Sequence, residues 1–96
     1  MEERLPFVEI VDTDNTRIRT FSHDTDESEL KWHQDGEDRW VKALNENDWQ
    51  VQLDDELPVN IPTQEHIFIP KYAWHRVIKG LSDLVVEVKL EEPRPE

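Results

Sequence analysis

The stretch Trp49-Gln50-Val51-Gln52-Leu53 decides the fold class, because apolar and polar residues alternate along it. Successive side chains of a β-strand point to opposite faces of the sheet, so this pattern predicts a strand with one buried and one solvent-facing side. The stretch Val86-Glu87-Val88-Lys89-Leu90 repeats the alternation near the other end of the chain. Both stretches therefore predict strands that cover one face of a core.

Shorter β-rich segments recur through the rest of the chain, separated by acidic or asparagine-rich turns and by prolines. We expect further strands at 7–11, 16–21, 30–35, 40–44, 66–69 and 75–79, and the second alternating stretch belongs to a strand expected at 84–90. In segment 16–21, Arg17 and Arg19 share one face, which is typical of an edge strand. No segment predicts a helix of more than a turn or two. Closely spaced short strands favour an all-β fold, a single antiparallel β-barrel or jelly roll of about eight or nine strands.

The length of 96 residues suits one domain with one modest core. We expect this domain to span residues 1–91 and to be followed by a frayed tail at 92–96, where there is no apolar side chain to pack. A core of this size leaves stability of roughly a few kcal/mol unless a metal ion or a partner subunit adds to it. A homodimer is therefore an expectation.

Charge and composition exclude several classes of partner. The chain has 23 acidic and 11 basic residues, a formal net charge of −12. This charge repels phosphate backbones and anionic lipids, which disfavours a nucleic-acid or membrane role. The chain has no cysteine, so any metal must be held by histidine and carboxylate side chains. The acidic start of the chain leads into no apolar stretch, so we expect an intracellular protein.

His33 and Asp35 are the first candidates for chemistry, because alternation in a strand would send both side chains to the same face. His75 is the best distant third donor, since it shares its expected strand face with the apolar Val77. Two histidines and one carboxylate make a facial set of the kind that holds non-haem iron and equally suits manganese, nickel or zinc. In the alternative interpretation, both histidines are satisfied polar residues at a barrel mouth and Asp35 pairs with an arginine.

The segments 30–44 and 69–77 resemble the two consensus motifs of the cupin superfamily, and the resemblance covers residues 30–80. The first cupin motif contains His-x-His followed by a glutamate and a glycine, and the second contains Pro-x-Gly-x-x-His. The resemblance assigns His33, Asp35 and His75 to metal positions, and Pro70 keeps its spacing to His75. It implies a small single-domain cupin barrel, similar to those of marine microbes and their bacteriophages. It also implies a divalent metal (Fe, Mn, Ni or Zn) and a small-molecule ligand, with a dioxygenase or an isomerase as the natural activities.

Three departures from the cupin motifs change the chemistry of the expected site. Arg39 stands where the glutamate ligand is expected, and Glu46 and Tyr72 replace the two motif glycines. Arg39 could form a bidentate pair with Asp35 and leave a metal-free pocket for an anionic ligand, or lie beside a bound metal and hold a ligand carboxylate. Glu37 is a reserve metal ligand.

Three classes of function stay open on this sequence. The first is a metal-dependent enzyme that acts on a small anionic molecule. The second is a non-catalytic barrel that binds a small ligand, and the third is a structural or interaction module that uses the barrel surface. The four tryptophans are expected to pack in the core or at an interface rather than to stack on a ligand. His23 and His66 are expected to lie outside the site.

Overall fold

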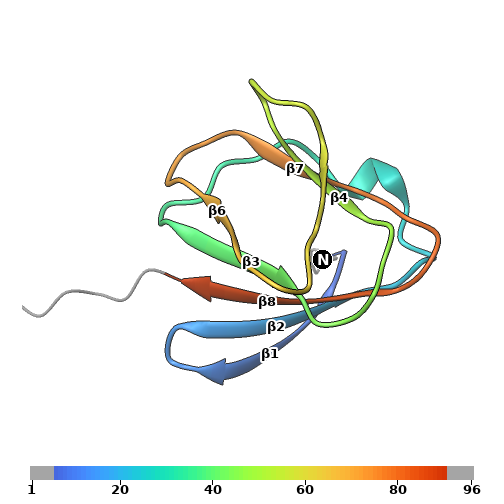
Figure 1. Ribbon diagram of the computed structural model, residues 1–96, viewed down its shortest axis with the longest axis horizontal. Helices are drawn as coiled ribbons and strands as arrows, with labels where there is room; N and C mark the ends of the chain where they lie inside the picture. The colour runs from blue at the N-terminus through green and yellow to red at the C-terminus, as the bar shows by residue number, and fades with distance from the viewer. Residues whose placement is uncertain (1–5, 91–96) are drawn as a thin grey trace, which may run out of the picture.

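Two antiparallel sheets face each other in the computed structural model, which describes residues 6–90 (Figure 1). Within that range the strands are β1 (Val8–Thr13), β2 (Thr16–Phe21), β3 (Arg39–Ala43), β4 (Gln50–Leu53), β5 (Val59–Asn60), β6 (Ile67–Ile69), β7 (His75–Ile78) and β8 (Leu84–Leu90). The larger sheet has the order β1-β2-β8-β3-β6, and the smaller has the order β5-β4-β7. The predicted all-β antiparallel barrel is confirmed. The predicted frayed tail at 92–96 lies outside the described residues.

The core fills the space between the two sheets, and the two alternating stretches supply much of it. Trp49 and Val51 are buried from the smaller sheet's side, and Leu84, Val86 and Val88 are buried along β8. Lys89 is exposed on the other face of β8, as the alternation predicts. The remaining core residues are Phe21, Ala43, Ile61 and Ile69.

The prediction that segment 16–21 lies at a sheet edge is wrong. β2 lies between β1 and β8, because β1 folds back in a hairpin along one of its edges and the distant β8 pairs with the other. Arg19 is paired directly opposite Val86, whose side chain is buried in the core. Residues directly opposite one another in an antiparallel pair project to the same face, so Arg19 points into the barrel.

The predicted strand at 30–35 is also absent. A short 3-10 helix, η1 (Glu27–Glu29), ends just before this segment. The segment itself pairs with β7 at a single bridge between His33 and His75. Beyond that bridge, the backbone carbonyl of Asp35 accepts a hydrogen bond from Tyr72 N at 2.8 Å. The segment therefore bonds to the turn between β6 and β7, and it makes too few ladder contacts to be a strand.

The sequence gives no hint of β5, which consists of two residues. Val59 pairs with Val51 of β4, and the prolines at 58 and 62 flank the strand. Proline cannot donate to a sheet ladder, so a strand between two prolines is short and lies at an edge. Within residues 6–90 there is no helix with the length and apolar character needed to cross a membrane.

Gly80, in the turn before β8, is expected to be intolerant of any side chain. A Cβ atom at this position would lie 2.8 Å from the backbone carbonyl carbon of Asp48 and would collide with the Asp48 carboxylate. That carboxylate accepts a hydrogen bond from Leu81 N at 2.9 Å, so it is not free to move aside. We expect Gly80→Ala to lower the free energy of unfolding by about 1–3 kcal/mol in urea denaturation.

The matched control for this substitution is Gly36→Ala. No heavy atom lies within 4 Å of a Cβ built at Gly36, and neither glycine has a positive φ. We expect Gly36→Ala to leave stability unchanged or to raise it by a few tenths of a kcal/mol, because alanine restricts the unfolded chain. Equal effects of the two substitutions would show that the turn at Gly80 relaxes around a methyl group.

Candidate metal centre

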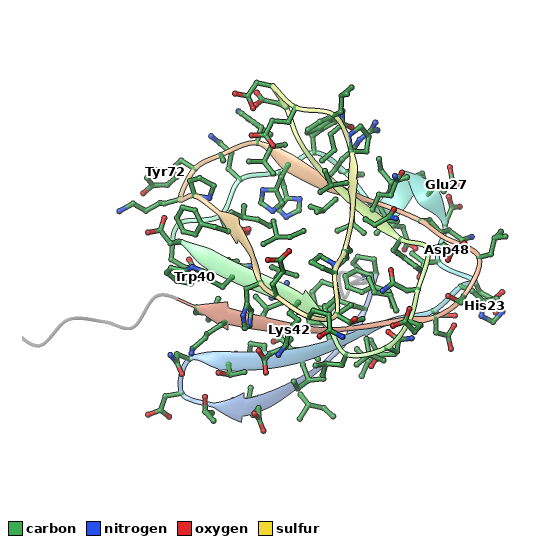
Figure 2. All side chains as sticks on the ribbon, in the orientation of Figure 1. His23, Glu27, Trp40, Lys42, Asp48 and Tyr72 are labelled. Atoms are coloured by element: carbon green, nitrogen blue, oxygen red, sulfur yellow. The ribbon has the colours of Figure 1, made fainter. Side chains whose placement is uncertain are left out.

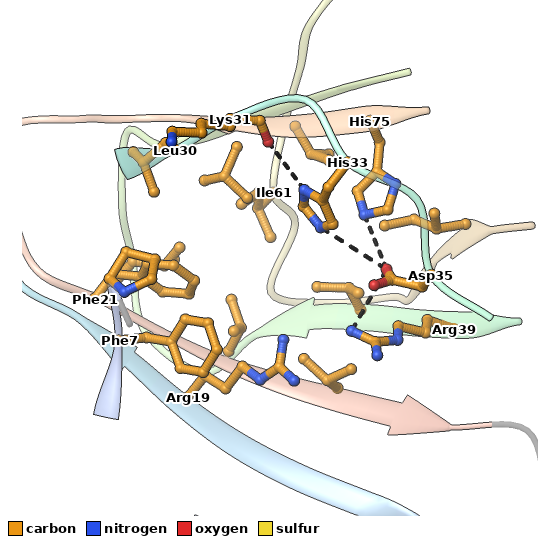
Figure 3. A pocket seen from close by; sticks show the side chains of 18 of the residues that line it. Phe7, Arg19, Phe21, Leu30, Lys31, His33, Asp35, Arg39, Ile61 and His75 are labelled. Atoms are coloured by element: carbon orange, nitrogen blue, oxygen red, sulfur yellow. Dashed lines mark hydrogen bonds and ion pairs between the residues drawn. The ribbon is translucent and has the colours of Figure 1, made fainter. Parts of the chain in front are cut away.

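The three residues expected to bind metal come together where β3 and β7 begin (Figure 3). His75 Nε2 lies 3.2 Å and His33 Nε2 lies 3.9 Å from Asp35 Oδ2. The three candidate ligand atoms lie within 4.8 Å of one another. His75 is buried, the Asp35 side chain is largely buried, and the His33 side chain is half-exposed. The cluster is therefore open to solvent on the His33 side.

Backbone hydrogen bonds hold the two histidines beside each other. His33 N donates to His75 O at 2.9 Å, and His75 N donates to His33 O at 3.0 Å. The two imidazole rings then lie 4.2 Å apart between centroids. The third residue is held by the bond from Tyr72 N to the carbonyl of Asp35, so all three ligand candidates are positioned by main-chain contacts.

Each histidine also has a fixed tautomer. His33 Nδ1 lies 2.9 Å from the carbonyl oxygen of Lys31, and His75 Nδ1 lies 2.9 Å from that of Ala73. A carbonyl oxygen can only accept a hydrogen bond, so Nδ1 carries the proton in both rings. The Nε2 atom of each neutral ring then presents a lone pair, the arrangement in which histidine binds metals.

When both imidazoles are neutral, three lone-pair atoms therefore converge without a proton among them. Asp35 Oδ2 is buried and accepts no hydrogen bond from any residue that the structure describes. A buried acceptor without a donor is unfavourable, and a cation in the centre of the group would satisfy all three atoms at once. Two imidazole nitrogens and one carboxylate oxygen fit a divalent transition metal.

The ionisation state of Asp35 is also suited to metal binding. Burial acts to raise the pKa of this carboxyl, but a hydrogen bond from His75, which Nε2 donates when it carries a proton, and the positive charge of Arg39 outweigh burial. The pKa of Asp35 therefore lies below its usual value, and the side chain is an anion at neutral pH. A carboxylate must be deprotonated to bind a metal.

Arg39, at the start of β3, contacts two carboxylates. Its Nη1 lies 3.5 Å from Asp35 Oδ2, whereas Nη2 and Nε donate to Glu37 Oε1 at 2.9 and 3.3 Å. The bidentate pair between Arg39 and Asp35 that one interpretation required is not formed. Glu37 bonds to Arg39 and lies outside the three-residue group, so it does not act as the reserve ligand in this arrangement.

A cavity of about 310 Å³ extends from the cluster into the barrel. Its walls are mainly apolar and include Phe7, Phe21, Leu30, Ile61, Val77 and Val86. Arg19 and Arg39 also line the cavity, which places two guanidinium groups against apolar walls. Arg19 was not predicted to lie at the site. The signal was present, since Arg19 shares a strand face with the core residue Phe21.

The turn before His75 contains a residue in an unfavourable backbone conformation. Tyr72, which replaces the second motif glycine, has φ 65°, in the left-handed region that favours glycine. Its carbonyl accepts from Gln34 Nε2 at 2.8 Å, and its amide donates to Asp35. The side chain is mostly exposed and lies at the opposite end of the longest axis from Asp48 (Figure 2). This conformation is therefore held by contacts that orient the cluster.

Two substitutions of Tyr72 are expected to change the free energy of unfolding in opposite directions. Tyr72→Gly should raise the free energy of unfolding by up to about 1 kcal/mol, because relief of the left-handed strain exceeds the entropy that glycine adds to the unfolded chain. Tyr72→Val should lower it by about 1–2 kcal/mol, because a β-branched residue tolerates positive φ poorly. Urea denaturation of the two variants checks this. A loss of stability in both would mean that the tyrosine ring itself supports the turn.

The other two histidines lie outside the cluster, as expected. His66 Nε2 lies 2.8 Å from Glu87 Oε1 on the outer face of the larger sheet, and His23 Nδ1 lies 2.7 Å from Asp83 Oδ1 in an exposed loop. None of the four tryptophans, all within the described residues, lines the cavity. Trp49 is in the core, and the others lie on outer faces or partly exposed.

The fold and the cluster together define an antiparallel β-barrel protein with two histidines and one carboxylate at one end of the barrel. The fold is the cupin fold. A cupin domain from Bordetella pertussis Tohama I superposes with a TM-score of 0.62 at 16% identity, over 96% of this chain and 100% of the other. A cupin superfamily protein from Desulfitobacterium hafniense DCB-2 superposes with a TM-score of 0.59 at 12% identity, over 96% of this chain and 84% of the other.

A protein from Neisseria meningitidis is similar to the same degree, with a TM-score of 0.62 at 21% identity over 95% of this chain and 89% of the other. No protein-family model and no curated protein matches the sequence. The structural likeness thus establishes the fold, whereas the chemistry depends on the residues of this chain.

Proposed function

We propose that this cupin-fold protein binds one divalent transition metal through His33 Nε2, Asp35 Oδ2 and His75 Nε2. The observation that carries the proposal is the convergence of two imidazole lone pairs on a buried carboxylate oxygen to which no described residue donates a hydrogen bond. The carbonyls of Lys31 and Ala73 hold the proton of each neutral imidazole on Nδ1, which leaves Nε2 as the metal-binding atom and thereby supports metal binding.

The ligand in this proposal is a small anionic molecule that enters the cavity beside the metal. Three protein ligands leave coordination positions open, and a metal held in this way supplies a Lewis acid on which either an oxygenase or an isomerase can depend. Arg39 Nη1 lies next to Asp35 and is placed to bind an anionic group of the ligand. Iron, manganese, nickel and zinc all suit this donor set.

A second candidate is a non-catalytic barrel with a metal-free pocket, which binds a small ligand or serves in an assembly. The distance of 3.2 Å between His75 Nε2 and Asp35 Oδ2 favours this candidate, because a single proton on Nε2 would satisfy both atoms. The two candidates differ in what cation occupies the group, a proton or a metal ion.

Metal analysis separates the two candidates. Protein purified without chelator should contain about one equivalent of metal. After removal of the metal, adding Fe(II), Mn(II), Ni(II) or Zn(II) at about 100 times its dissociation constant should add about 2.7 kcal/mol to stability. For a chain of this size, that corresponds to an increase in Tm of roughly 10 °C or more.

Two controls make this experiment specific. Mg(II), which prefers oxygen ligands, should not raise Tm. His66→Gln should leave the metal response unchanged, because His66 pairs with Glu87 away from the cluster, whereas His75→Gln should remove it. Absence of metal after purification, together with no Tm increase from any of the four metals, would overturn the metal proposal and leave the metal-free barrel.

Three broader expectations remain predictions that accompany this function. We propose an intracellular protein whose domain spans residues 1–91. We also propose a homodimer, which is supported by the edge strand β1, where Val8, Ile10 and Val11 are exposed. An edge strand with exposed branched side chains can pair with a second copy.

A further inference from the structure

Arg19 is the cavity-lining arginine whose hydrogen-bonding capacity is least used. Its Nε donates to Glu9 Oε2 at 2.6 Å, and its guanidinium carbon lies 4.4 Å from the ring centroid of Phe7. Neither Nη1 nor Nη2 contacts a polar atom of any described residue. All three guanidinium nitrogens of Arg39, in contrast, lie next to Glu37 or Asp35.

The surroundings of Arg19 make these two nitrogens available to a ligand. The side chain is largely buried, with 19% of its surface exposed, and Figure 3 shows its guanidinium reaching past Phe7 into the cavity. A buried charge is tolerated only when it is paired, and Glu9 provides that pairing from the neighbouring strand β1. The pair thus keeps Arg19 in place while its outer edge stays open.

The free edge of Arg19 matches a carboxylate. Two adjacent guanidinium N–H groups bind the two oxygens of a carboxylate in a planar fork. Arg19, Lys31 and Arg39 balance the negative charges of Glu9, Glu29 and Asp35 around the cavity. A monoanion is therefore favoured over a dianion, because it leaves less uncompensated charge against apolar walls. The mainly apolar walls disfavour a sugar, whose hydroxyl groups would lose hydrogen bonds with water and find few partners.

We propose that Arg19 anchors the carboxylate of a small organic acid with an apolar body, such as an aryl-alkyl acid. The apolar body fills the cavity between Phe7, Phe21 and the inward valines, and its far end faces the His33, Asp35 and His75 cluster. This inference rests on the proposed function in one respect, that the cavity beside the cluster is the ligand site. It differs in assigning the anionic group of the ligand to Arg19 rather than to Arg39, whose guanidinium nitrogens already contact Glu37 and Asp35, and it adds the chemical class of the ligand.

A matched set of probes tests the carboxylate anchor. Binding of 3-phenylpropionate, 3-phenylpropionamide and phenyl phosphate is measured by calorimetry on the metal-free and the metal-loaded protein. We expect the acid to bind at least about 10-fold more tightly than the neutral amide, because it gains charge-assisted hydrogen bonds. Tighter binding of phenyl phosphate than of the acid would overturn the carboxylate assignment, and equal binding of acid and amide would overturn the anchor.

Substitutions in β2 and β1 locate the anchor. Arg19→Gln should weaken binding of the acid by about 10-fold to 100-fold and leave the amide unchanged. Arg17→Gln is the control, since it removes the same charge from the same strand, but Arg17 bonds to the backbone carbonyls of Thr13 and Asp14 and does not line the cavity. An equal loss of affinity for the acid in the two variants would mean that the effect comes only from the change in net charge. That result would overturn the assignment of Arg19 as the anchor.

Glu9→Gln provides a test that does not depend on the folding of Arg19→Gln. Glutamine retains a hydrogen-bond acceptor for Arg19 Nε but removes the competing negative charge, so the acid should bind about threefold more tightly and the amide equally well. Weaker binding of the acid would contradict the proposal.

The metal proposal can fail separately. Acid binding that depends on Arg19 in a protein that takes up no metal would leave the anchor and remove the metal function. Metal uptake together with equal binding of acid and amide would leave the metal function and remove the carboxylate anchor.

Discussion

Asp35→Asn is expected to weaken metal binding at least 100-fold while leaving the metal-free protein about as stable as the parent. Loss of a residue that merely orients a metal ligand costs about 10-fold to 100-fold in affinity, so loss of a charged ligand should cost at least as much. In the metal-free protein, the new amide can donate a hydrogen bond to the lone pair of His33 Nε2 or His75 Nε2. That bond offsets the lost ion pair with Arg39, and we expect the free energy of unfolding to change by less than about 1 kcal/mol.

Glu37→Gln is the matched control for this result. Glu37 lies two residues along the chain and bonds to the same Arg39, but it is not part of the three-residue group. Its replacement should change metal affinity by no more than about threefold, since only a charge outside the coordination sphere is lost. Metal titration followed by calorimetry or by Tm measures both variants. Similar losses of affinity would mean that the metal is held differently from the arrangement proposed.

Trp49→Ala is expected to remove most of the stability of the fold. Trp49 is completely buried, its ring packs 5.5 Å from that of Phe21, and its Nε1 donates to Ser82 O at 2.5 Å. Truncating a buried tryptophan costs about 3–5 kcal/mol, which is comparable to the stability of roughly a few kcal/mol expected for a core of this size. We expect a fall of this size in the free energy of unfolding in urea, or a chain that is already largely unfolded in buffer by circular dichroism.

Trp74→Ala is the matched control, because it removes the same type of side chain from an exposed position. Trp74 precedes His75 in the chain, but 46% of its surface is exposed. We expect its replacement to change the free energy of unfolding by about 0.5–1 kcal/mol or less. A larger effect of Trp74→Ala than of Trp49→Ala would contradict the assignment of Trp49 to the core.

The strand faces were predictable where the sequence alternates strictly. Trp49, Val51, Val86 and Val88 were expected on buried faces and are buried, because a period of two determines which side chains share a side of any strand. The segment 30–35 shows the limit of this reasoning. His33 and Asp35 do lie together, but backbone bonds to the turn before β7 bring them there rather than strand alternation.

The candidate site was predictable in its members and not in its contacts. The resemblance selected His33, Asp35 and His75, and these three lie within 4.8 Å of one another. Two interpretations of Arg39 were open, and neither had Glu37 as its main partner. The pattern around Arg19 predicted an edge strand, and a side chain on such a strand is not expected in the cavity.

The sequence by itself determined the all-β class, the acidic character, the restriction of any metal to histidine and carboxylate ligands, and the inward face of the alternating strands. These properties depend on composition and on the two-residue repeat, which act locally along the chain. Only the tertiary structure decided that β2 lies between β1 and β8, that Arg19 faces the cavity, and that the carbonyls of Lys31 and Ala73 leave two imidazole lone pairs beside Asp35. Those results depend on which distant segments share backbone hydrogen bonds, and that choice minimises the free energy of the whole barrel rather than of any one segment.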